Sequence, residues 1–150
     1  MTAAVVALAL GAGVAACGSD DEDTTSASDE TTETASAEEV SLTTGDTDDG
    51  YTWEVDPIPT ADTKSISYTN DSQEPHALIF ARVNEGYTLE EAYELEGEKG
   101  SATTVAEGEV GPGETAEIKV KGKIEPGDYA MLCPIPGHYQ QGQLEEFEIQ

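Results

Sequence analysis

Residues 129–143 read YAMLCPIPGHYQQGQ and carry the strongest structural signal in this 150-residue chain. They place a thiol, an imidazole and a side-chain amide at intervals of five residues, in Cys133, His138 and Gln143. The two prolines and the glycine between the thiol and the imidazole stiffen the chain and favour a reversal, which brings His138 beside the sulfur. The stretch therefore predicts a tight loop that gathers candidate metal ligands.

Strands are expected on both sides of this loop. Because side chains alternate along a strand, Tyr129, Met131 and Cys133 share one face, and the thiol ends a row that points into the core. After Gln143, the run LEEFEI at residues 144–149 predicts the closing strand.

A second imidazole comes from the segment NDSQEPHALIF at residues 70–80, where His76 opens a β-rich run. A lone buried cysteine is more often a packing residue, and a lone histidine is more often a satisfied polar group. Together, however, two imidazoles and one thiolate with a weak axial ligand are diagnostic of blue copper. The chain has only these two histidines, so the proposed ligand set uses both of them and leaves none for a second site.

The rest of the chain from Tyr51 onward favours a β-sandwich. Short β-rich runs are separated by Gly, Pro, Asn and Asp, a spacing typical of antiparallel sandwiches. Alternation is clearest at residues 116–121, where Ala, Ile and Val share one face and Glu and Lys the other. A capping box of Thr88 and Glu91 predicts one short inserted helix over residues 88–97.

The ligand segments resemble those of the cupredoxins, the plastocyanin- and azurin-like type 1 blue copper proteins. Cys133-x4-His138 with an intervening Pro-Gly is similar to their ligand loop, and Asn70 followed by Pro75-His76 is similar to their upstream segment. Gln143 stands where many members have methionine, and a glutamine there resembles the axial ligand of stellacyanin-like members. The resemblance implies an all-β, antiparallel Greek-key β-sandwich over residues 51–150.

The resemblance also implies the chemistry. One type 1 copper ion would be held by the metal ligands His76, Cys133, His138 and Gln143, in an electron-transfer protein that is not an enzyme. The backbone N–H of Ile135 is the expected donor to the thiolate, because the prolines on either side of it have no N–H to give. His138 would serve as the electron port within an apolar patch formed by Pro134, Ile135, Pro136 and Tyr139.

The amino-terminal region resembles the signal of a bacterial lipoprotein. Residues 3–16 form an uncharged apolar run that is too short to span a bilayer. The run ends in Val14-Ala15-Ala16-Cys17, which resembles a lipobox. We therefore expect residues 1–16 to be a signal peptide and Cys17 to carry palmitate or a similar acyl chain, which anchors the exported protein at the extracytoplasmic face of the cell membrane.

The segment that follows is expected to be a disordered acidic linker. Between Gly18 and Gly50 there are twelve acidic residues and no basic one, and Val40 and Leu42 are the only sizeable apolar groups. Such a composition does not offset the entropy of ordering. We accordingly divide the chain into the lipidated Cys17 with its linker at 17–50 and the cupredoxin-like domain at 51–150. An acidic docking motif for a partner is an alternative reading of the linker.

The charge and composition of the chain limit the classes of binding partner and of function that it can have. A formal net charge of -26, from 32 acidic against six basic residues, excludes nucleic acid, because binding to phosphates rests on Lys and Arg. Oxidases and nitrite reductases need further histidines for additional copper centres. We expect a monomer that binds redox partner proteins transiently and is attached to the membrane by the lipid on Cys17.

Two other functions remain open from the sequence. A copper storage or delivery protein would use the same ligands but depends on affinity and exchange rather than on reduction potential. A binding module could also keep the sandwich without a metal. A potential-tuned electron carrier is favoured because the Cys-His-His set is complete.

Overall fold

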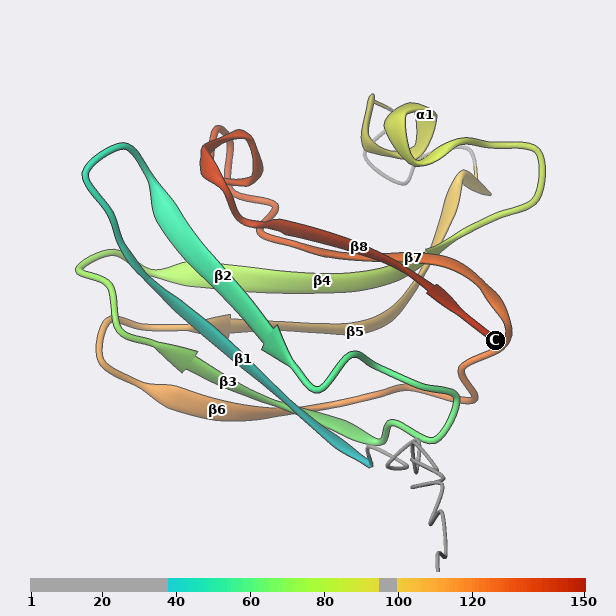
Figure 1. The fold of residues 1–150 in the computed structure, drawn as a ribbon, viewed down its shortest axis with the longest axis horizontal. Coiled ribbons are helices and arrows are strands. Elements are labelled where there is room, and N and C mark those ends of the chain that lie inside the picture. Colours follow the sequence, from blue (N-terminus) through green and yellow to red (C-terminus); the bar gives the residue numbers. More distant parts are fainter. Residues whose placement is uncertain (1–37, 95–99) are drawn as a thin grey trace, which may run out of the picture. The chain divides into compact units, whose positions relative to one another are not determined.

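The computed structural model of the chain describes residues 38–94 and 100–150 (Figure 1). The predictions of a signal peptide, of lipidation at Cys17 and of a disordered segment up to residue 37 lie outside these residues.

Two four-stranded sheets form the fold. The first has the order β2-β1-β3-β6, with β1 at Glu39–Asp46, β2 at Tyr51–Asp56, β3 at Ser65–Asn70 and β6 at Thr115–Lys119. The second has the order β5-β4-β7-β8, with β4 at His76–Val83, β5 at Ala102–Val110, β7 at Gly127–Leu132 and β8 at Leu144–Ile149. The predicted β-sandwich is confirmed. All strand pairs are antiparallel except β1 with β3, which is parallel.

Strand β1 corrects the predicted linker, which was wrong at its carboxyl end. Residues 39–46 form an inner strand that pairs with both β2 and β3. Within it Val40, Leu42 and Thr44 are fully buried, while Glu39 and Ser41 are exposed. Only every second residue of such a strand needs to be apolar, so its composition resembles that of a polar linker. The sandwich therefore begins before residue 51.

The core lies between the two sheets. Trp53 and Tyr68 of the first sheet meet edge to face with ring centres 5.6 Å apart, and Phe80 and Tyr129 of the second meet at 5.3 Å. Burying each such side chain contributes about 1.5–3 kcal/mol. Tyr129, Met131 and Cys133 all face this core, as the alternation predicts. The other buried apolar residues here are Val40, Leu42, Ile66, Leu78, Val105, Ala106, Val110, Ile118, Ile124 and Ile149.

The α-helix α1 covers Leu89–Glu94. Its predicted capping box is confirmed: the N–H of Thr88 donates to Glu91 Oε2 at 2.8 Å, and the N–H of Glu91 donates to Thr88 Oγ1 at 3.2 Å. Tyr93 of the helix donates to Glu146 of β8 at 3.1 Å, which ties α1 to the second sheet. Residues 95–97 of the predicted helix lie outside the described residues. Among those that are described, no helix is long and apolar enough to cross a membrane.

Candidate metal centre

Four buried side chains meet near the ends of strands of the second sheet. His76 is the first residue of β4, Cys133 directly follows β7, and Gln143 directly precedes β8. His138 lies just before η2, a short 3-10 helix at Tyr139–Gln141. The exposed fractions are 1% for His76, 9% for His138 and 0% for Cys133 and Gln143. In Figure 1 the β1–β2 turn and the η2 connection lie at the same end of the sandwich.

The two imidazoles and the thiol converge through specific atoms. The Nδ1 atoms of His76 and His138 are 3.1 Å apart, and Cys133 Sγ is 3.7 Å from His138 Nδ1. One ligand atom from each residue lies within 4.8 Å of the other two. Between two neutral imidazole nitrogens at this distance only one proton fits, whereas both lone pairs and a thiolate suit a shared cation. The donor set fits a soft metal ion.

Burial changes the proton affinity of both ligand types. Desolvation raises the pKa of the Cys133 thiol, and the backbone N–H groups of Ala77 and Ile135 oppose this by favouring the thiolate. Ile135 is the backbone donor expected from the sequence, and Ala77, which acts on the thiolate in the same way, was missed by sequence reasoning. Desolvation and the neighbouring His138 lower the pKa of His76. A neutral imidazole is the form that binds a metal.

The ligand loop is closed by its own backbone. The N–H of Cys133 donates to the carbonyl of Gln143 at 3.2 Å, and the N–H of Gln143 donates to the carbonyl of His138 at 3.2 Å. The N–H of His138 in turn donates to the carbonyl of Ile135 at 3.0 Å. Gly137, with φ at 93°, supplies the left-handed residue of the turn. The three loop ligands are therefore held by a common set of bonds.

Asn70 fixes the segment that delivers His76. Its side-chain amide donates to the carbonyls of Glu74 at 2.8 Å and Val110 at 3.0 Å. Its Oδ1 accepts from the backbone N–H of Ser72 at 3.0 Å and from the Ser72 hydroxyl at 2.7 Å. Both donors and both acceptor positions of the buried amide are used. This explains physically why an asparagine stands six residues before His76.

Tyr51, which sequence reasoning missed, packs on both histidines. Its ring centre lies 4.7 Å from that of His76, edge to face, and 4.8 Å from that of His138. Its hydroxyl donates to Glu74 Oε2 at 2.9 Å. A signal for this contact exists in the sequence, because Asp49-Gly50 between two β-rich runs predicts a hairpin turn. That turn becomes visible only when residues 39–46 are read as a strand.

Gln143 contacts Thr44 of β1, a third residue that sequence reasoning missed. Gln143 Nε2 donates to Thr44 Oγ1 at 2.5 Å. Its Oε1 is buried and has no hydrogen-bond partner among the described residues. An interaction with the Gln143 side chain raises the pKa of His76, against the larger effect of burial. The amide therefore lies between β1 and the histidine.

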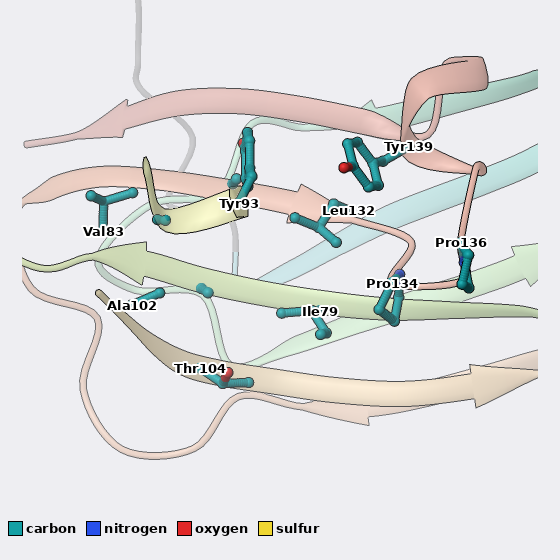
Figure 2. Close-up of a pocket in the computed structure, with 12 residues that line it drawn as sticks. Ile79, Val83, Tyr93, Ala102, Thr104, Leu132, Pro134, Pro136 and Tyr139 are labelled. Atoms are coloured by element: carbon teal, nitrogen blue, oxygen red, sulfur yellow. The ribbon is translucent and has the colours of Figure 1, made fainter. Parts of the chain in front are cut away.

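An apolar surface adjoins the ligand loop. Figure 2 shows Leu132, Pro134, Pro136 and Tyr139 on one side of a cavity of about 420 Å³ and Tyr93 of α1 near them. Three of the four predicted patch residues thus border one cavity. The fourth, Ile135, lines a separate cavity of about 390 Å³ beside His76.

Comparisons with known proteins support this fold. No protein-family model matches the sequence, and no curated protein matches it. The structure is similar to dithionite-reduced auracyanin from the photosynthetic bacterium Roseiflexus castenholzii, with 20% identity and a TM-score of 0.51, covering 73% of this chain and 94% of that one. It is also similar to auracyanin A, a "blue" copper protein from Chloroflexus aurantiacus, with 20% identity and a TM-score of 0.50, covering 75% and 99% of the two chains.

This likeness identifies the fold as that of the cupredoxins. The McoA multicopper oxidase from Aquifex aeolicus also matches, with 17% identity and a TM-score of 0.47, over 73% of this chain and 28% of that one. The buried set of two imidazole nitrogens and one thiol sulfur at this position of the fold fits one type 1 copper ion.

Proposed function

We propose that the chain binds one copper ion through His76, Cys133 and His138 and carries single electrons between partner proteins. The observation that carries the proposal is the convergence of the two Nδ1 atoms and Sγ in one buried cluster. Copper bound there would supply a one-electron Cu(II)/Cu(I) couple. We propose a carrier with no catalytic turnover.

The protein's own part is to hold the ligands still. The hydrogen bonds of the loop, the satisfied Asn70 and the ring of Tyr51 restrain both histidines and the thiol. The N–H groups of Ala77 and Ile135 stabilise negative charge on the sulfur. A frame of this kind needs little rearrangement when the charge of the site changes, and burial of Cys133 excludes water.

Gln143 is proposed as the axial ligand through Oε1. The atom is buried and has no hydrogen-bond partner among residues 38–94 and 100–150, which costs about 1–3 kcal/mol unless a donor or a cation faces it. An amide oxygen is a harder donor than a thioether and favours Cu(II), so this residue lowers the reduction potential of the site.

Electrons are proposed to pass through His138. It is the most exposed of the four site residues, at 9%, and Pro134, Pro136 and Tyr139 lie in the apolar surface next to it. A brief contact with a redox partner at this surface is sufficient for transfer, because such encounters bury little area.

Copper titration of the purified protein tests the proposal. We expect one equivalent of Cu(II) to produce intense visible absorption from thiolate-to-copper charge transfer and a paramagnetic resonance spectrum with a small copper hyperfine splitting. Cys133→Ser removes the band, whereas Cys17→Ser, the matched control, keeps it. A colourless Cu(II) complex would falsify the electron-transfer assignment, and rapid loss of copper to a chelator would favour delivery instead.

The location is proposed from the lipobox. Cys17 would carry the lipid that anchors the exported protein at the extracytoplasmic face of the membrane. Metabolic labelling with a palmitate analogue is expected to mark the wild type and not Cys17→Ser, and equal labelling of the two proteins would reject the anchor.

A further inference from the structure

We infer that Thr44 selects which end of the Gln143 side-chain amide faces the copper ligands, and so makes oxygen the axial donor. The inference rests on the proposed copper site and adds a positioning residue to it. Thr44 is fully buried on β1, in a part of the sequence with no resemblance to a metal-binding motif.

The direction of the hydrogen bonds at Thr44 carries the argument. A threonine hydroxyl has one proton and accepts with its lone pairs. Thr44 Oγ1 lies 2.9 Å from the carbonyl oxygen of Thr52 on β2, and a carbonyl only accepts, so the proton points to β2. Toward Gln143 the hydroxyl then offers only a lone pair.

Gln143 completes a series of hydrogen bonds in which each donor and acceptor is fixed. Its Nε2 lies 2.5 Å from Thr44 Oγ1 and donates to the lone pair that remains. Because the NH₂ group faces Thr44, Oε1 points the other way. That oxygen is buried and has no hydrogen-bond partner in the described part of the chain.

The reversed amide is disfavoured at both of its ends. Thr44 would have to turn its proton away from Thr52 to donate to the amide oxygen, and the Thr52 carbonyl would lose this donor. The NH₂ group would face the cluster, where a cation is to bind and where positive partial charges repel it. A side-chain amide could turn either its oxygen or its NH₂ group toward the copper ligands. Through Thr44, strand β1 thus selects the oxygen.

Two variants of Thr44 separate the hydroxyl from the packing. Thr44→Ser keeps the hydroxyl, and Thr44→Val keeps the shape without it. Copper-loaded Thr44→Val is expected to show a positive shift of the reduction potential and a changed visible spectrum, because the oxygen donor is no longer held toward the copper. Thr44→Ser is expected to match the wild type. If Thr44→Val does not fold, Thr44→Ala takes its place.

Gln143→Leu distinguishes failure of this inference from failure of the axial-ligand proposal. If Gln143→Leu shifts the potential and Thr44→Val does not, Thr44 has no positioning role. If Gln143→Leu changes nothing, Gln143 is not an axial ligand and both ideas fall. In the Gln143→Leu background, Thr44→Val is expected to add no further shift, and an undiminished shift there overturns the inference by assigning the effect to packing. Thermal unfolding of the copper-free variants reports the purely structural cost.

Discussion

Gly142 lies so close to Tyr51 that a Cβ at position 142 would be 2.7 Å from the Tyr51 carbonyl oxygen. Its φ of 111° is also one that residues with side chains rarely adopt. This approach joins the ligand loop to the β1–β2 turn, the two parts of the chain that supply Gln143 and Tyr51 to the site.

The contact predicts the effect of an alanine at Gly142. Gly122→Ala is the matched control, because Gly122 also has positive φ, at 77°, but nothing lies within 4 Å of an added Cβ. Both variants incur a backbone cost of about 1 kcal/mol, and Gly142→Ala adds a clash that raises its loss of unfolding free energy by a further ~1–3 kcal/mol. Denaturant unfolding of the copper-free proteins measures the difference. Equal losses in the two variants would mean that the loop and the turn are not tightly packed.

Gln143→Met is expected to raise the reduction potential of the copper-loaded protein. A thioether stabilises Cu(II) less than an amide oxygen does, and each tenfold change in relative affinity for the two oxidation states corresponds to about 59 mV. Gln140→Met, in the exposed η2 segment, is the matched control and is expected to leave the potential unchanged. Potentiometric titration followed in the visible band measures both. A lower potential in Gln143→Met would contradict an axial role for the amide oxygen.

The environment of Tyr93 leads us to expect that the free energy of unfolding falls at high pH. Burial, the negative charge of Glu146 and the hydrogen bond to Glu146 raise the pKa of the Tyr93 phenol above its ordinary value of 10.0. A raised pKa in the folded state stabilises the protein below the unfolded value, and this contribution is lost as the pH rises through the folded value. Between about pH 9 and 11, Tyr93→Phe should therefore lose less unfolding free energy than the wild type. Parallel pH profiles would show that the phenol does not titrate differently on folding.

Most of the features that could be predicted from the sequence are local, and each lies close in the chain to a residue with a distinctive pattern around it. The loop from Cys133 to Gln143, the strand before it and the capping box at Thr88 follow local rules of alternation, turn chemistry and capping. Thr44, Tyr51 and Ala77 were missed because their roles depend on pairings between distant segments. Thr44 meets Gln143 across 99 residues, and its own segment has the acidic, threonine-rich composition of a linker.

Because β1 is an inner strand of the first sheet, we expect that residues 51–150 alone do not form the native sandwich. Removing it takes Val40 and Leu42 out of the core, leaves facing edges of β2 and β3 unpaired, and deletes Thr44 from the site. A chain of residues 34–150 is expected to unfold cooperatively and to give the blue copper spectrum, whereas residues 51–150 are expected to aggregate or to lack both properties. Leu42→Ala in the full chain tests the same packing more gently, with an expected loss of about 2–5 kcal/mol. Ser41→Ala, on the exposed face of β1, is the control with little expected effect. If the shorter chain folded and bound copper as the longer one does, β1 would be dispensable and the first sheet would be complete without it.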